Sequence, residues 1–172
     1  MNAIKAFLDA SETAIGFLCV VILLTMFVLG VTEVFCRYVV QYSLSFPEEL
    51  IRFLFVWSVF LGSALAVRKN SHAAIELFVS WLPRGLAKAA IIFSLVVSAV
   101  FFAILIVKGY DVVLRVQGHK SPAMRLSMGF PYAAIPIGAA FMLLYTLEVM
   151  VRELFGRDPG EGEVDESALA GN

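Results

Sequence analysis

Apolar residues occur in four long runs along the chain, and charged residues gather in the segments between them. The runs that contain no charged residue are residues 13–32, 53–67, 89–107 and 126–147. A helix needs about 20 residues to cross the hydrocarbon core of a bilayer, and each run reaches or approaches that length. Each run must be helical, because lipid offers no partner to an unpaired backbone N–H or C=O group. The pattern predicts membrane spans at residues 13–36, 48–67, 88–109 and 130–153.

The segment between the second and third runs is amphipathic rather than uniformly apolar. Its apolar residues recur at helical spacing on one face: Ile75, Phe78, Val79 and Leu82. Its polar residues recur every four positions on another face: His72, Glu76, Ser80 and Arg84. A helix of this kind lies in the membrane interface, which is also the usual depth of a tryptophan such as Trp81. We therefore predict a short interfacial helix over residues 72–82.

The composition supports a membrane protein. Of the 172 residues, 60% are hydrophobic and 16% are charged, and the mean hydropathy is +0.88. Soluble domains carry about 45–50% apolar and about 25% charged residues. The predicted fold class is an all-α integral membrane protein, with a four-helix membrane domain over residues 1–155. Residues 156–172 are rich in acidic residues and glycine, which predicts a disordered tail.

Charged residues lie near the ends of the predicted spans, where opposite charges recur at i,i+4 spacing. We expect Glu33 to pair with Arg37, Glu48 or Glu49 to pair with Arg52, and Glu148 to pair with Arg152. A proton or substrate site would need an unpaired acidic residue near the middle of the membrane. The sequence contains none, so we expect no substrate-binding residue in this chain.

The sequence also lacks the residues that catalysis or cofactor binding would need. The only histidines, His72 and His119, lie outside the spans, and the sequence has no phosphate-binding glycine loop or metal-ligand spacing. Cys19 and Cys36 are about 25 Å apart on one helix, too far for a disulfide. We expect no catalytic residue, metal site or cofactor. With a net charge of −1, nothing favours binding to nucleic acid.

Small residues recur every four positions on three spans, which allows helices to approach closely in lipid. In the second span they are Ser58, Gly62 and Ala66, and in the fourth they include Ala134 and Gly138. Trp57 lies near the middle of the second span, away from the interfacial depth typical of tryptophan. These residues serve either the chain's own core or contact with another subunit. The candidate contact residues for a partner are Glu48, Glu49, Arg52, Trp57, Ser58, Gly62 and Ala66.

The order and spacing of several motifs resemble one family, the small membrane subunit (DctQ type) of tripartite ATP-independent periplasmic (TRAP) transporters. Those in the first half are Arg37-Tyr38, the segment 45–52, Trp57, Leu61-Gly62-Ser63-Ala64, Arg68 and His72. Those in the second half are Leu82-Pro83, Ser121-Pro122 and Ile135-Pro136-Ile137-Gly138. The resemblance covers about residues 14–153. One departure is Ala73-Ala74-Ile75-Glu76, where the family tends to show a more hydrophobic stretch that ends in Asp.

The resemblance implies a scaffold role in a sodium-coupled transporter of organic acids. In such transporters a large multi-span membrane subunit holds the substrate and sodium sites and moves as an elevator. A periplasmic substrate-binding protein delivers the substrate. The resemblance also implies a bacterial inner membrane location, with both termini in the cytoplasm and lipids around the subunit. The basic residues are too evenly divided between the two sides to set this orientation alone.

Two other functions stay open from the sequence. The first is a self-sufficient four-helix homodimeric exporter with an essential acidic residue in its first span. Glu33 is a poor candidate for that residue, because it lies at the end of the run and one turn from Arg37. The second is a tetraspan assembly factor with no part in transport.

Overall fold

The computed structural model describes residues 2–42, 45–70 and 84–155. The predicted interfacial helix, with Ile75, Phe78, Val79, Trp81 and Leu82, and the predicted tail at 156–172 lie outside the described residues. Four helices are long and apolar enough to cross a membrane, and the described residues contain no strand. The predicted fold class, all-α with four membrane-spanning helices, is therefore confirmed.

The first two spans are joined by a short connection. Helix α1 covers Asn2–Phe35 and continues as the π-helical turn η1, Cys36–Val40. Helix α2 covers Ser45–Asn70, with the buried Pro47 near its start and Glu48 in its first turn. Proline near the start and an acidic residue in the first turn favour this boundary, because the proline lacks an N–H and the acid meets the positive end of the helix dipole.

The other two spans follow the undescribed segment. Helix α4 covers Arg84–Val116, and the short helix α5, Gly129–Tyr132, leads into α6, Ala134–Phe155. The loop between α4 and α5 forms a tight turn in which Ser121 N–H donates to the Leu126 carbonyl at 2.8 Å. Arg125 adopts a left-handed backbone (φ 54°) in this turn.

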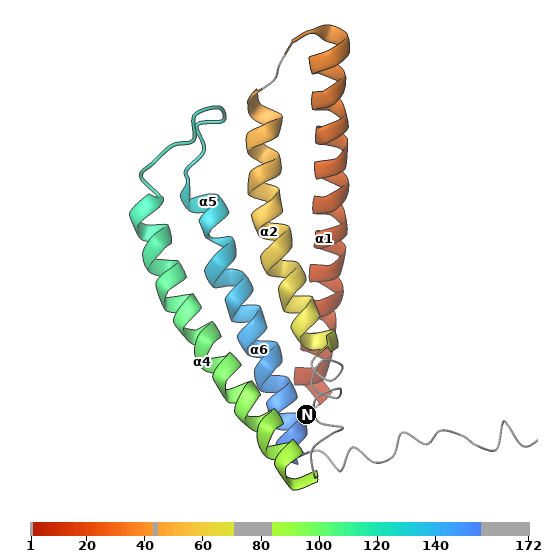
Figure 1. The fold of residues 1–172 in the computed structure, drawn as a ribbon, viewed down its shortest axis with the longest axis vertical. Coiled ribbons are helices and arrows are strands. Elements are labelled where there is room, and N and C mark those ends of the chain that lie inside the picture. The colour runs from red at the N-terminus through yellow and green to blue at the C-terminus, as the bar shows by residue number, and fades with distance from the viewer. Residues whose placement is uncertain (1, 43–44, 71–83, 156–172) are drawn as a thin grey trace, which may run out of the picture.

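The four spans lie side by side in the order α1, α2, α6, α4 (Figure 1). Helix α2 packs between α1 and α6, and α4 packs against α6 and α5. Helices α2 and α6 run in the same direction (Figure 1). Because α1 and α4 form the two edges of this row, large parts of their surface contact no other helix among the described residues.

The core is a narrow seam where α1, α2 and α6 meet. Its buried residues are Leu8, Ile15, Ile22, Leu61, Ala64, Met142 and Tyr145. The α1 members recur every seventh residue, so a single stripe of α1 faces the neighbouring helices. The remaining α1 surface exposes large apolar side chains such as Phe17 and Phe27, as expected where lipid replaces water.

Small residues of the fourth span allow the closest helix contacts. A Cβ atom added at Gly138 would lie 2.6 Å from the Phe60 Cβ atom of α2. Gly109 of α4 faces Ile135 and Pro136, where an added Cβ would lie 3.0 Å from the Ile135 Cγ2 atom. Ala134 is also fully buried. The small residues of the fourth span therefore serve contacts inside this bundle.

Candidate functional site

The small residues of the second span face away from the bundle, unlike those of the fourth. A Cβ atom added at Gly62 would meet no described residue beyond its own helix within 4 Å, and Ala66 is exposed. Phe55 and Val59 are exposed on the same side of α2. We call this surface, made by Phe55, Val59, Gly62 and Ala66, the outer face of α2. It is apolar and shallow, and it lies on one of the two central helices of the row.

Ser58 borders the outer face without adding an unpaired polar group. Its Oγ donates to the Phe55 carbonyl of its own helix at 2.8 Å. A hydroxyl satisfied in this way can face an apolar neighbour without the cost of an unmade hydrogen bond.

Trp57 lies on the opposite side of α2. Its indole packs against the core seam, and its ring centroid is 5.8 Å from that of Phe130 in α5. Side chains five positions apart point about 140° away from each other around the helix axis. Trp57 and Gly62 therefore cannot share one contact face. The Trp57 Nε1 atom is buried and has no hydrogen-bond partner among the described residues. The structure thus groups Trp57 with the core and Gly62 with the outer face.

The acidic residues at the start of α2 have separate roles. Glu48 pairs with Arg52, as the spacing predicts. Glu49 instead accepts hydrogen bonds from the backbone N–H groups of Ala123 and Met124, at 3.1 and 2.8 Å. Glu49 therefore holds the α4–α5 loop against α2. The expected pair of Glu33 with Arg37 is present, at 2.6 Å.

A groove opens beside these charges, between the start of α2 and the α5–α6 segment. Its volume is about 640 Å³. Glu48, Glu49 and Arg52 line its polar end, while Phe53, Val56 and Ile135 line its apolar part.

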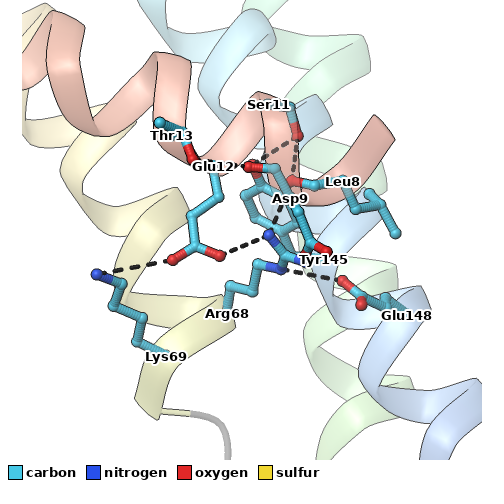
Figure 2. Close-up of polar contacts among 9 residues, drawn as sticks. All are labelled: Leu8, Asp9, Ser11, Glu12, Thr13, Arg68, Lys69, Tyr145 and Glu148. Carbon is cyan, nitrogen blue, oxygen red and sulfur yellow. Dashed lines mark hydrogen bonds and ion pairs between the residues drawn. The ribbon is translucent and has the colours of Figure 1, made fainter. Parts of the chain in front are cut away.

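A charged cluster at the other end of the bundle joins three helices around Arg68 (Figure 2). Its guanidinium group contacts Asp9 and Glu12 of α1 and Glu148 of α6, with 2.5 Å to Glu12 and 3.2 Å to Glu148. It also donates to the Leu8 carbonyl at 2.8 Å and lies 5.4 Å from the centre of the Tyr145 ring. Only 8% of the Arg68 side chain and 9% of the Glu148 side chain are exposed.

Arg68 lies in one of the motifs that carry the family resemblance, but this cluster was not predicted from the sequence. Its members are 56 to 80 residues from Arg68 along the chain, so helical spacing could not reveal the contacts. One feature of the sequence could have indicated it. In an up-and-down bundle the start of the first span and the ends of the second and fourth lie at the same end, and the charged residues Asp9, Glu12, Arg68 and Glu148 lie there. The predicted Glu148 partner, Arg152, has a side chain outside the described residues.

The described residues include no group of three or more His, Cys, Asp or Glu side chains placed to hold a metal ion. What the geometry offers is an apolar outer face on α2, a groove with a charged end, and a charged cluster that ties three helices together. These features connect helices of the bundle or leave a surface open for contact.

Comparison with known proteins identifies a family. A family model described as "Tripartite ATP-independent periplasmic transporters, DctQ component" matches residues 26–156. A Haemophilus influenzae protein provisionally named a TRAP transporter small permease protein is 27% identical over 83% of this chain and 88% of its own length.

Two further relatives carry names that include a substrate. The C4-dicarboxylate TRAP transporter small permease protein DctQ of Rhodobacter capsulatus is 31% identical over 62% of this chain and 48% of its own length. The sialic acid TRAP transporter small permease protein SiaQ of Vibrio cholerae is 30% identical over 59% of this chain and 58% of its own length. The chain thus spans most of the first relative and about half of the other two.

Proposed function

The chain belongs to the DctQ component family of the tripartite ATP-independent periplasmic transporters, and on that premise we propose that it is a static membrane scaffold. The family is a component of a transporter, and this chain is its multi-pass small permease subunit. In the proposed role the subunit enlarges a fixed wall against which the large membrane subunit moves its substrate. The observation that carries the proposal is the open outer face of α2, on a central helix of a row that Arg68 ties together.

We place the main contact with the large subunit on this outer face. Among the described residues, nothing beyond the neighbouring turns of its own helix lies within 4 Å of a Cβ at Gly62, which leaves room for the backbone of another helix to approach. Close backbone approach is a main source of helix association in lipid, because lipid and apolar side chains do not differ in hydrophobicity. Exposed Phe55 and Val59 add contact area beside that position.

Arg68 supports this role by holding the helices that present the face. Its contacts link α2 to both of its neighbours, α1 and α6, at one end of the row. A scaffold needs such cross-links, since a sliding load on α2 would otherwise move α2 against its neighbours.

The transported substrate is proposed to be an organic acid, taken up together with sodium. The support is that two relatives are named for C4-dicarboxylate and for sialic acid, both of which carry carboxylate groups. We place the substrate and sodium sites on the large subunit, and we expect a periplasmic binding protein to deliver the substrate.

We also propose that both termini lie in the cytoplasm of a bacterium, at its inner membrane. The contacts of Arg68 with Asp9 and Glu148 bring the beginning of α1 and the end of α6 to the same end of the bundle. Arg68 and Lys69 lie in the last turn of α2 at that end. The assignment of that end to the cytoplasm rests on the family, because basic residues are nearly as frequent at the other end.

The test is reconstitution in liposomes. The chain with its large subunit and binding protein should take up an organic acid when a sodium gradient is imposed, and the chain alone should take up none. Sodium-driven uptake by the chain alone would overturn the scaffold proposal and favour the homodimeric exporter. Failure to copurify with any large permease subunit would favour the assembly factor.

A further inference from the structure

The groove between α2 and the α5–α6 segment has no role in the function proposed above. It is about 640 Å³ in volume, within the range of about 300–1,000 Å³ typical of sites for small molecules. Its walls are formed by two membrane-spanning helices that begin at the same end, at Ser45 and Gly129, and by Pro122 and Ala123 of the α4–α5 loop. Since both helices are long and apolar enough to cross a membrane, lipid molecules surround them and can reach the groove.

The groove changes from charged to apolar along its length. Glu48 and Arg52 lie about 5 and 10 Å along the axis from the start of α2, at 1.5 Å per residue. The polar headgroup region is about 5–8 Å thick on each side of the hydrocarbon core, and the long Arg52 side chain can reach back to it. Phe53, Val56 and Ile135 line the part that lies deeper in the membrane. An occupant must therefore be polar at one end and apolar below it.

The charges at the polar end require partners that the described residues only partly supply. The Arg52 side chain is 73% exposed and the Glu48 side chain 52% exposed, although the two contact each other. A guanidinium group has five N–H donors in a planar fork that matches phosphate oxygens. The pairing with Glu48 leaves donors of Arg52 free, and exposed charge is costly at the edge of hydrocarbon. Glu48 in turn retains oxygen lone pairs for a cationic donor.

We propose that this groove binds one phospholipid that carries both a phosphate and a primary ammonium group, as phosphatidylethanolamine does. The phosphate contacts Arg52, the ammonium group donates to Glu48, and one acyl chain lies along Phe53, Val56 and Ile135. Charge complementarity selects this occupant over a purely apolar helix, which would leave Arg52 and Glu48 without new partners. The site is built from residues of this chain, we expect it to be occupied both in the isolated chain and in the transporter, and it does not depend on the scaffold role.

The experiment measures lipid retention by native mass spectrometry. The full chain is purified in detergent and mixed with phosphatidylethanolamine, phosphatidylcholine or phosphatidylglycerol of identical acyl chains. One phosphatidylethanolamine molecule should be retained preferentially, because the methylated ammonium of phosphatidylcholine cannot donate and phosphatidylglycerol has no ammonium. Arg52→Gln should lower retention by roughly tenfold, the effect of losing one charge-assisted contact.

Three further variants locate the site. Glu48→Gln should abolish the preference for phosphatidylethanolamine over phosphatidylcholine, and Val56→Trp should block the groove and lower retention of all three lipids. Arg115→Gln is the matched control, since Arg115 is an exposed arginine in the last turn of α4 and does not line the groove. Helical circular dichroism and the melting temperature confirm that each variant is folded.

Equal retention of the three lipids by the unmodified chain, or equal retention by Arg52→Gln and Arg115→Gln, would overturn the proposal. The same measurement on the complex with the large subunit gives an independent check. If phosphatidylethanolamine is retained by the isolated chain but excluded from the complex, the occupant in the transporter is a helix of the large subunit and the proposal is wrong. Retention in both supports it.

Discussion

The Arg68 Nε atom of α2 lies 3.2 Å from a carboxylate oxygen of Glu148 in α6, although the two residues are 80 positions apart in the chain. Both side chains are more than nine-tenths buried. Asp9 and Glu12 approach the same guanidinium group from α1 (Figure 2), so one arginine joins three of the four spans. The other end of the bundle is joined by Glu49, which binds backbone rather than another charge.

Arg68→Gln should destabilise the chain strongly. Removing one partner of a buried ion pair leaves the other buried and uncompensated, which costs about 3–5 kcal/mol. We expect a large fall in the melting temperature in detergent. The matched control is Arg37→Gln, because the Arg37 side chain is half exposed. Among the described residues it pairs only with Glu33, one turn earlier in the continuous α1–η1 helix. Such exposed pairs contribute about 0–1 kcal/mol. Equal melting temperatures for the two variants would show that the Arg68 cluster does not hold the bundle together.

Gly62→Leu should weaken assembly with the large subunit, whereas Gly138→Leu should lower the stability of the chain itself. Gly62 has open space in front of it, so Gly62→Leu should fold normally and lose copurification with the large subunit by at least about tenfold. An added Cβ at Gly138 would lie 2.6 Å from Phe60 Cβ, so Gly138→Leu should lower the melting temperature of the isolated chain. Full copurification of Gly62→Leu would move the contact surface to another helix.

Glu49→Ala should loosen the α4–α5 loop. The Glu49 carboxylate accepts two backbone N–H groups, and hydrogen bonds to charged groups contribute about 1.5–3 kcal/mol each. Hydrogen exchange at the Ala123 and Met124 amides should therefore accelerate by roughly tenfold or more. Glu48→Ala serves as the control, because Glu48 lines the same groove but contacts Arg52. The same acceleration in both variants would argue against a specific role for Glu49.

Trp57→Phe and Trp57→Ala should separate packing from hydrogen bonding. Trp57→Ala removes a large side chain from the core seam and should cost about 3 kcal/mol. Trp57→Phe keeps most of the packing and removes an N–H that has no partner among the described residues, so stability should change by less than about 1.5 kcal/mol. Copurification should survive Trp57→Phe. Its loss would show that Trp57 also matters for contact with the large subunit.

The amino-acid sequence alone determined the class and number of the membrane helices. Hydrocarbon requires every backbone group to be paired within its own segment, so a long apolar run allows only a helix. The same local rule explains why the pairs Glu33–Arg37 and Glu48–Arg52 could be predicted from i,i+4 spacing. The family motifs could be recognised in the sequence as well, because each is a short local pattern and the motifs follow one another in a fixed order.

Only the tertiary structure decided which face of each helix meets a neighbour. Every face of these helices is apolar, so the contrast between polar and apolar sides that orients a helix in water is missing here. The stripes at Gly62 and Gly138 look alike in the sequence, yet one faces outward and the other contacts Phe60. The Arg68 cluster was hidden for the same reason: its partners come from helices whose order in the row depends on packing between residues far apart in the chain.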